Sequence, residues 1–290
     1  MRFGLTILPE HPWKDAAPMW RRAEELGFDH AWTYDHLVWG GLPDSPWYGT
    51  TPTLTAAAMV TSRIRLGTFV TSPNYRHPVT FMRDLLALDD ISGGRLICGI
   101  GAGGDIDSGI LGGDPLTPKE RVDRLHEFIG LLDRLLTQDH VSHRGTYFSA
   151  VDARTLPGPV QQPRIPFVIA ANGPRTLRLA VEHGVGWLTT GPTAETMDEW
   201  WAALSALCGR LDEELAKAGR DSATFERHLS FDSSPLFALS SVGTFEEMTG
   251  RAGELGFTDV ITHWPRPDGP YAGDVSVLES VASDVLPGLR

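Results

Sequence analysis

The chain has 290 residues, of which 41% are hydrophobic and 21% charged, as in an ordinary globular protein rather than a disordered one. Its 25 basic and 37 acidic residues give a formal charge of −12 without a basic cluster, so we expect neither nucleic acid nor an anionic membrane surface as a partner. The 31 glycines and 21 prolines follow no repeat and indicate many turns or close backbone approaches.

The two cysteines, Cys98 and Cys208, stand in an apolar run and a helical stretch, so we expect buried free thiols and neither a disulfide nor a thiolate zinc site. The chain begins directly in a strand-like run, and no apolar run approaches about 18 residues, which favours a cytoplasmic protein without a membrane span.

Short apolar runs alternate with helical patterns from residue 3 onward. The predicted strands are Phe3–Leu8, Phe28–Thr33, Ile64–Val70, Arg95–Gly101, Phe167–Ala171, Trp187–Thr190, His228–Asp232 and Asp259–Trp264. The predicted helices lie at about 18–27, 51–60, 79–91, 118–136, 174–184, 194–218, 244–256 and 275–285. Thr117, Pro118 and Glu120 form a capping-box pattern at the start of the fourth helix.

Eight strand–helix units in one chain predict a (β/α)8 TIM barrel that forms a single domain over residues 1–290. Residues 138–165 break the rhythm and predict an insertion between the fourth helix and the fifth strand, with a small β excursion. A doubly wound parallel sheet is the alternative, because hydrophobic periodicity does not reveal whether a sheet closes.

In either architecture the functional site lies at the carboxyl ends of the strands. Polar and small residues gather there: Pro9-Glu10, Tyr34–His36, Thr71–Asn74, Gly101–Gly104, Asn172–Pro174, Thr189–Gly191, Asp232–Ser234 and His263-Trp264. His36 can donate or accept a proton or bind a ligand. Trp39 and Trp264 can wall an aromatic pocket.

The segment Gly99–Gly104 matches G-x-G-x-x-G, but three strand–helix units precede it and the next predicted helix begins only at Pro118. We therefore expect close backbone approach to a flat ligand at Gly101 and Gly103 rather than a dinucleotide site. The turn Asn172-Gly173-Pro174-Arg175 leads straight from a strand into a helix and favours a phosphate, with Thr190 and Gly191 at the next strand end.

Metal chemistry has little support. His140 and His143 lie in the excursion with no carboxylate pattern around them, and the Asp105–Gly109 segment has Leu116 where a calcium loop needs glutamate. The sequence thus predicts no metal site and a small-molecule ligand.

The segments FDHAWTYDHL (28–37), SRIRLGTFVTSPNYRHPVTFMRDLLALDDISGGRLICGIGAGG (62–104) and IPFVIAANGPRTLRLAVEHGVGWLTTG (165–191) resemble the bacterial luciferase-like family of flavin- and deazaflavin-dependent oxidoreductases. The resemblance implies a TIM barrel with an insertion near the fifth strand and a homodimer. It implies a flavin-type ring at the barrel mouth, supported by a cis peptide at Phe69–Val70, and a phosphate at the turn after the fifth strand.

The resemblance places His36 near the reactive ring carbon and Thr71 and Asn74 at ring heteroatoms. It favours coenzyme F420, an 8-hydroxy-5-deazaflavin, over FMN. The pattern departs from sugar-phosphate dehydrogenases of this branch at Gly104, where they carry glutamate, so the acid role is unfilled or falls to Asp105.

The preferred hypothesis is therefore a deazaflavin-dependent hydride transfer to or from a small organic substrate, with Glu10, Trp39, Asp105 and Trp264 as substrate-pocket candidates. The alternatives are an FMN-dependent monooxygenase that uses reduced flavin and oxygen, and a barrel that binds flavin without catalysis.

Overall fold

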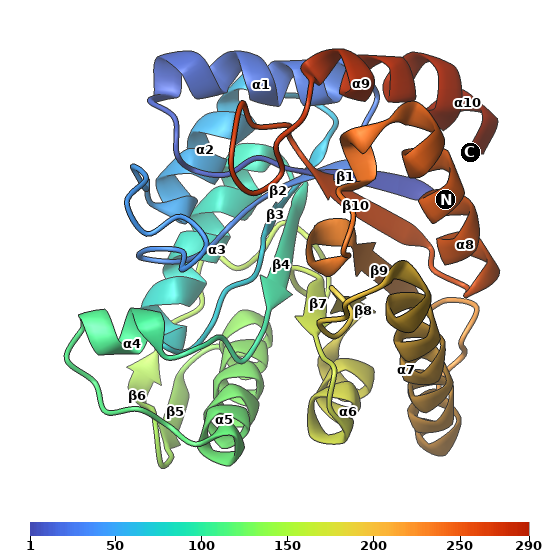
Figure 1. Cartoon of the computed structure of the whole chain (residues 1–290). Helices are drawn as coiled ribbons and strands as arrows, with labels where there is room; N and C mark the ends of the chain where they lie inside the picture. The colour runs from blue at the N-terminus through green and yellow to red at the C-terminus, as the bar shows by residue number, and fades with distance from the viewer. Residues whose placement is uncertain (290) are drawn as a thin grey trace.

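The structure is a computed structural model that describes residues 1–289, and its centre is a closed barrel of parallel strands (Figure 1). Within these residues eight strands pair in the order β1-β10-β9-β8-β7-β4-β3-β2. They are β1 (Arg2–Thr6), β2 (His30–Thr33), β3 (Arg65–Thr68), β4 (Leu96–Ile100), β7 (Phe167–Ala170), β8 (Gly186–Thr189), β9 (Glu226–Ser230) and β10 (Asp259–His263). Because the sheet closes, the predicted TIM barrel is confirmed and the doubly wound alternative is wrong.

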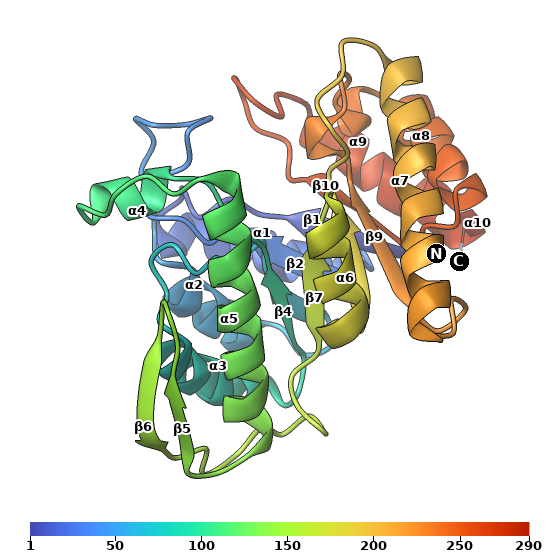
Figure 2. The ribbon, with the colours of Figure 1, turned by 90° about the horizontal axis from the view of Figure 1, so that it is seen from below.

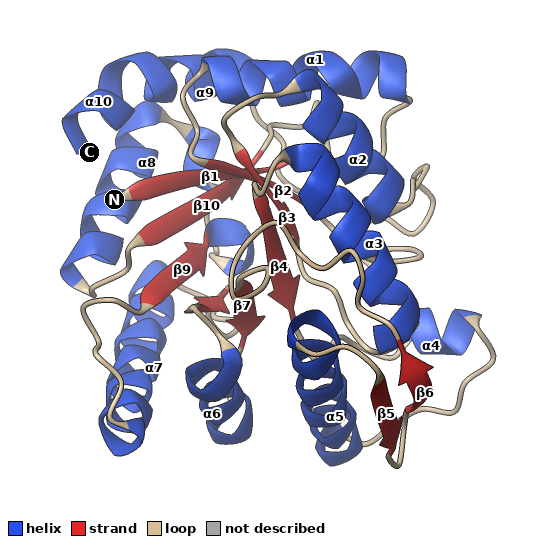
Figure 3. Cartoon of the chain, turned by 180° about the vertical axis from the view of Figure 1, so that it is seen from behind, coloured by secondary structure: helices blue, strands red, loops and turns tan. Residues whose placement is uncertain are grey.

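Helices surround the barrel on the outside (Figure 3). They are α1 (Trp13–Glu25), α2 (Thr50–Val60), α3 (Pro78–Ser92), α4 (Ile106–Ile110), α5 (Pro118–Thr137), α6 (Pro174–His183), α7 (Met197–Ala218), α8 (Val242–Glu254), α9 (Val275–Ser280) and α10 (Leu286–Leu289). A π-turn at Val281–Val285 joins the last two. The predicted capping box at the start of α5 is present. The sequence did not predict α4, because five residues that include a glycine carry no helical period.

The predicted excursion at residues 138–165 contains an antiparallel hairpin, β5 (Val141–Arg144) and β6 (Ser149–Ala153). The hairpin lies outside the barrel against α5 (Figure 2). The Glu127 carboxylate on α5 accepts hydrogen bonds from the backbone N–H groups of Thr146, Tyr147 and Phe148 at 2.8–3.0 Å. The insertion is thus fixed to an outer helix.

The apolar core has two layers. One lies between the strands and the helices, and the other fills the barrel interior with Leu8, Trp32, Tyr34, Phe69, Ile97, Val168, Leu188 and Ile261. Side chains of a strand alternate between these two layers. His30, Trp32 and Tyr34 therefore point inward in succession, from the floor of the barrel to its mouth.

The two ends of the described chain meet at the floor side of the barrel (Figure 1), where the amino group of Met1 lies 3.4 Å from the carbonyl oxygen of Leu289. Cys98 and Cys208 are buried and unpaired, as predicted. Burial raises the pKa of Cys208 to about 11. Among residues 1–289, no helix combines the length and apolarity that crossing a bilayer requires.

Candidate active site

The barrel mouth is lined by an aromatic group that we call the aromatic mouth: Tyr34, Trp39, Phe69, His263 and Tyr271. Tyr34 stacks on Phe69 with ring centroids 5.7 Å apart, and the edge of Trp39 meets Tyr34 at 5.3 Å. Tyr271 stacks on His263 at 3.7 Å and lies parallel to Trp39 at 6.0 Å. These flat faces suit a planar ring system.

The Tyr34 hydroxyl is the polar centre of the aromatic mouth. Its oxygen lies 3.0 Å from His263 Nε2 and 3.1 Å from Tyr271 Oη, and it donates to Asp232 Oδ2 at 3.2 Å. Burial lowers the pKa of His263 to about 3, so this imidazole is neutral at neutral pH. The sequence pattern places Tyr34, Asp232 and His263 at strand ends but gives no sign that one hydroxyl joins them.

His36, the predicted catalytic residue, lies just beyond β2 beside the aromatic mouth. Its Nδ1 is 2.7 Å from Asp107 Oδ2, and Asp107 Oδ1 accepts the backbone N–H of Leu37 at 2.7 Å. Asp107 is buried, while the His36 side chain is 24% exposed. Its Nε2 has no hydrogen-bond partner among the described residues, so the carboxylate fixes the ring with Nε2 free for a ligand.

Asp107 is a functional candidate that the sequence reasoning missed. The sequence pattern places it only in the Asp105–Gly109 segment, which resembles part of a calcium loop, and it stands on α4, which the sequence did not predict. The Asp-x-Asp pattern after the glycine-rich segment was the signal available, but nothing in that spacing points to a histidine 71 positions earlier.

The Phe69–Val70 peptide bond is cis, as the family resemblance implied. The glycines of β4 and its following loop pack close to this bond. A Cβ atom at Gly101 would lie 2.7 Å from Val70 Cγ2, and one at Gly103, whose φ is +65°, would lie 2.3 Å from Asn74 Nδ2. The glycine-rich segment therefore serves close packing of the mouth loops.

Thr71 and Asn74 use their side chains within the protein. The Thr71 hydroxyl donates to Asp35 Oδ2 at 2.6 Å, and the Asn74 amide donates to the Gly104 carbonyl at 2.5 Å and accepts from Arg124. The Thr71 hydroxyl is buried and its proton is used on Asp35, so its predicted contact with a ring heteroatom stays a prediction. Both residues shape the loops at the mouth.

Asp35 is a buried anchor next to His36. It forms an ion pair with Arg76 at 2.7 Å. Burial alone would raise the pKa of Asp35, but Arg76 and the hydroxyls of Thr71 and Tyr75 outweigh it and hold that pKa below its usual range. The pair ties the end of β2 to the loop after β3 and so positions His36.

The predicted phosphate site lies at the neighbouring ends of β7 and β8. The Thr189 hydroxyl donates to Asn172 Oδ1 at 2.6 Å and accepts the Gly191 N–H at 2.9 Å. Gly173 is the N-cap of α6 and Pro174 its first residue, and a Cβ at Gly173 would meet nothing closer than 3.8 Å. First-turn amides have no intrahelical partner, so this open turn suits an anion. The neighbouring Thr190 donates its hydroxyl to the Gly191 carbonyl.

Arg175 of this turn and Arg124 of α5 differ in their partners. Arg175 forms an ion pair with Asp123, so it reaches an anion in the turn only by leaving that carboxylate. Arg124 donates to Asn74, and its Nε is buried without a hydrogen-bond partner in residues 1–289. Burial lowers the pKa of Arg124. Sequence reasoning missed Arg124 because a helical arginine carries no sign of the direction in which it points.

Of the predicted substrate-pocket residues, Trp39 belongs to the aromatic mouth. Glu10 forms two hydrogen bonds, of 2.7 and 3.0 Å, with Arg266. Asp105 forms a 2.7 Å ion pair with Arg121. Glu10 thus holds an arginine of the loop after β10, and Asp105 one at the start of α5.

The prediction for Trp264 is wrong. Its side chain packs against the outer core and lines a shallow hollow with Pro18, Met19 and Val275, on the helix side of β10. Because side chains alternate along a strand, the inward orientation of His263 sends the next residue outward.

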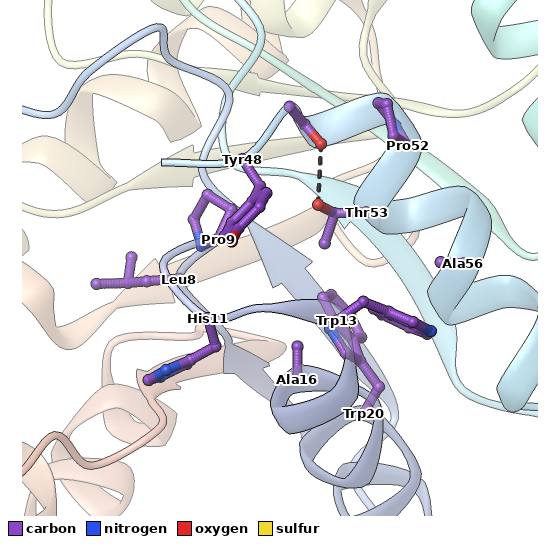
Figure 4. A pocket seen from close by; sticks show the side chains of 11 residues that line it. Leu8, Pro9, His11, Trp13, Ala16, Trp20, Tyr48, Pro52, Thr53 and Ala56 are labelled. Carbon is purple, nitrogen blue, oxygen red and sulfur yellow. Dashed lines mark hydrogen bonds between the residues drawn. The ribbon is translucent and has the colours of Figure 1, made fainter. Parts of the chain in front are cut away.

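An apolar hollow of about 360 Å³ lies beside the mouth, between the starts of α1 and α2 (Figure 4). Pro9, Trp13, Trp20, Tyr48 and Pro52 contribute to its wall. Its lining is almost wholly apolar, so it offers shape rather than reactive groups.

Three potential metal ligands, His30, His228 and Asp259, gather at the barrel floor, far from the mouth. Trp32 Nε1 donates to His30 Nδ1 at 2.6 Å, which leaves the His30 proton on Nε2, 3.0 Å from Asp259 Oδ1. That nitrogen has no lone pair for an ion, and Arg2 also binds Asp259 at 2.7 Å. The geometry is that of a buried charge network.

Comparison with known proteins agrees with this architecture. Residues 1–233 match the model of the luciferase-like monooxygenase family, and the chain belongs to that family.

An F420-dependent glucose-6-phosphate dehydrogenase of Amycolatopsis mediterranei is 32% identical, over 93% of this chain and 92% of the relative. An F420-dependent hydroxymycolic acid dehydrogenase of Mycobacterium tuberculosis is 34% identical, over 57% of this chain and 46% of its own length. A solved F420-dependent secondary alcohol dehydrogenase, in complex with an F420-acetone adduct, shares the fold with a TM-score of 0.83 at 17% identity, over 100% of this chain and 99% of that one.

Proposed function

We propose that this chain is an oxidoreductase that moves a hydride between coenzyme F420 and a small organic substrate. The observation that carries the proposal is that one barrel rim holds both the flat aromatic mouth and the open first turn of α6. These features suit the ring and the phosphate of a deazaflavin, and the relatives are named F420-dependent dehydrogenases. The bound coenzyme would supply the hydride chemistry, and the barrel would supply position and electrostatics.

The residues proposed to hold the coenzyme come from four strand ends. Those at the ring are Phe69, Val70, Thr71, Asn74, Gly101 and Gly103, where Thr71 and Asn74 act through the loops that they hold. Those at the phosphate are Asn172, Gly173, Pro174, Arg175, Thr190 and Gly191, and we add Arg124, whose Nε is buried without a hydrogen-bond partner in residues 1–289.

His36 is proposed to hold the oxygen of the substrate through Nε2, since Asp107 occupies Nδ1. Trp39 would pack on the carbon skeleton. The dehydrogenase names of the relatives support a hydroxyl or carbonyl carbon as the reacting group.

Titration of the purified apoprotein with F420 and, separately, with FMN tests the choice of cofactor. We expect F420 fluorescence to change saturably and FMN to bind at least about tenfold more weakly, a difference of roughly 1.4 kcal/mol. Tight FMN binding without F420 binding would favour an FMN-dependent monooxygenase. Coenzyme binding without turnover of any alcohol or ketone would favour a non-catalytic barrel.

Gly173 offers a matched pair of variants for the phosphate site. Its backbone φ of −103° and open surroundings admit a side chain. Gly173→Asp places a carboxylate at the N-terminus of α6 and should weaken F420 binding by about tenfold or more, because like charges repel there. Gly173→Asn has the same shape without the charge and should weaken binding less. Equal losses would place the phosphate elsewhere.

We also propose that the protein is a homodimer through the α2–α3 face. Met59 on α2 and Ile91 on α3 are 73% and 41% exposed, although both are large and apolar. Light scattering should give twice the chain mass for the natural sequence and the single-chain mass for Met59→Glu. A monomeric natural protein would contradict the proposal.

A further inference from the structure

The Tyr34 oxygen has as many partners as a phenol can bond. A phenol oxygen carries one proton and two lone pairs, and here His263, Tyr271 and Asp232 lie 3.0–3.2 Å away. His263 belongs to β10, and Asp232 follows β9 directly. Tyr271, in contrast, stands in the loop after β10, so its hydroxyl is the partner that a ligand can displace.

Asp232 is placed to exchange a proton with Tyr34. Its Oδ2 accepts from the Tyr34 hydroxyl, while its Oδ1 is buried and has no hydrogen-bond partner among residues 1–289. The groups that face it are Tyr34 from β2, Tyr271 from the loop after β10, Ser230 of β9 and the backbone amide of Ser233. No arginine or lysine is among them.

Burial raises the pKa of Asp232, and the hydrogen bond from Tyr34 and the nearby Ser230 hydroxyl oppose this only in part. Burial also raises the pKa of Tyr34 well above its usual value. Tyr34 therefore stays a neutral phenol, while the acid and the carboxylate forms of Asp232 lie closer in free energy than those of an exposed aspartate.

We infer that Tyr34 is the catalytic residue that exchanges a proton with the substrate oxygen, and that Asp232 receives and returns this proton through the Tyr34 hydroxyl. The inference rests on the proposed function and deepens it. In alcohol oxidation the substrate hydroxyl takes the place of the Tyr271 hydroxyl. The substrate O–H bond breaks toward Tyr34 Oη, the Tyr34 proton passes to Asp232 Oδ2, and the substrate carbon loses its hydride to the coenzyme. A carbonyl group forms, and carbonyl reduction is the reverse.

This arrangement divides the work at the mouth. His36 holds the substrate oxygen at the rim of the barrel, and Tyr34, deeper in the aromatic mouth, moves the proton. It also fills the acid role that Gly104 and the ion-paired Asp105 leave open. Asp232 acts through Tyr34 and is a positioning residue.

Infrared spectroscopy of the protein without coenzyme tests the proton store directly. We expect a protonated-carboxyl band that persists at pH values where exposed aspartates are ionised. Asp232→Asn should abolish this band. The control variant Asp268→Asn, at an exposed position of the loop after β10, should retain it. In Tyr34→Phe the band should persist to higher pH, because the carboxylate loses a donor. If Asp232→Asn leaves the band unchanged, the inference is overturned even if no substrate is known.

Turnover with F420 and either 2-propanol or glucose 6-phosphate, whichever is oxidised, tests the relay. Tyr34→Phe should lower kcat by about 10²–10⁴-fold with a smaller change in KM. In a plot of kcat against pH, Asp232→Asn should remove the change in kcat that follows the titration of Asp232. Asp232→Glu should restore this change in part.

Variants that bind F420 normally and keep the natural pH profile would overturn the relay and leave the proposed function intact. If the natural protein binds no F420, the proposed function fails instead. The infrared band then still shows whether Asp232 stores a proton.

Discussion

At the scale of single residues, the buried Asp107 carboxylate determines how His36 can act. It occupies Nδ1 and leaves Nε2 without a hydrogen-bond partner in residues 1–289. His36→Ala should lower turnover by about 10²–10⁴-fold and leave the F420 dissociation constant within a few-fold, because His36 is proposed to contact substrate and not the phosphate. Steady-state kinetics and fluorescence titration measure the two effects. The control is His126→Ala, at an exposed position of α5. Full turnover in His36→Ala would remove His36 from the reaction.

Gly103 gives a prediction about packing at the mouth. Both Gly103 and Gly112 have positive φ, but only at Gly103 would a Cβ atom collide with neighbouring side chains. Gly112→Ala should lower the free energy of unfolding by about 1 kcal/mol through its backbone conformation alone. Gly103→Ala should lower it by about 2–3 kcal/mol, because Asn74 and Ser72 must also move. Urea unfolding at neutral pH measures both. Equal costs would mean that the loop accommodates the methyl group freely.

The residue scale also shows what sequence can predict about this site. His36 and the glycines come within a few residues of a strand end, and Trp39 follows in the loop after β2, so strand order brings them to the mouth. Asp107, Tyr271 and Arg124 reach the mouth from a short helix, a loop and an outer helix. Their approach depends on tertiary packing, which a linear pattern does not encode.

At the scale of elements, the loop after β10 is clamped over the mouth by one ion pair. Arg266 binds Glu10 and also donates to the carbonyl oxygens of Asp268 and Pro270. Glu10→Gln should lower the free energy that holds this loop in place by about 1.5–3 kcal/mol. Amide hydrogen exchange in residues 266–273 should therefore become faster. The matched control is Glu247→Gln, exposed on α8. Unchanged exchange in Glu10→Gln would show that other contacts hold the loop.

Glu24 on α1 joins a helix to a strand and gives a prediction with a pH dependence. Its carboxylate accepts the backbone N–H groups of Ser62, Arg63 and Ile64 before β3. Burial opposes ionisation, but these hydrogen bonds outweigh it and lower the Glu24 pKa from 4.5 to about 2. Because the pKa is lower in the folded state, the stabilisation is complete above about pH 4.5 and is lost as the pH falls toward 2.

Glu24→Gln should therefore lower the free energy of unfolding by about 1–2 kcal/mol at pH 7, and this difference should shrink between pH 4.5 and pH 2. Urea unfolding of both proteins across this range is the measurement. Glu25→Gln, the more exposed neighbour, serves as the control. A difference that stays constant down to pH 2 would contradict the assignment.

Element prediction from the sequence succeeded where the period was long. All eight barrel strands and the long helices lie close to their predicted positions, because each repeats a buried face over several turns or alternations. It failed for α4, where too few residues define a period. It also failed for the outward orientation of Trp264, because one step along a strand reverses the face to which a side chain points.

At the scale of the whole molecule, the barrel separates stability from chemistry. Its floor holds the buried network of Arg2, His30, His228 and Asp259, and its mouth holds the groups proposed for catalysis. The sequence predicted the architecture because strand–helix alternation extends through the entire chain. Closure and the side-chain network across the mouth follow from three-dimensional packing, and the family resemblance supplied what the pattern alone left open.

The contact between Met1 and Leu289 means that the order of the units in the gene is not essential to the barrel. A circularly permuted chain, joined across the two ends by a short glycine–serine linker and opened in the exposed turn at Asp221–Ala223, keeps every strand beside its present neighbours. We expect it to fold, with the circular dichroism of the natural chain and unchanged F420 affinity, since both the join and the single opening lie on the side opposite the mouth. Such a permutant would carry its new ends between α7 and β9, a position for fused partners remote from the substrate entrance.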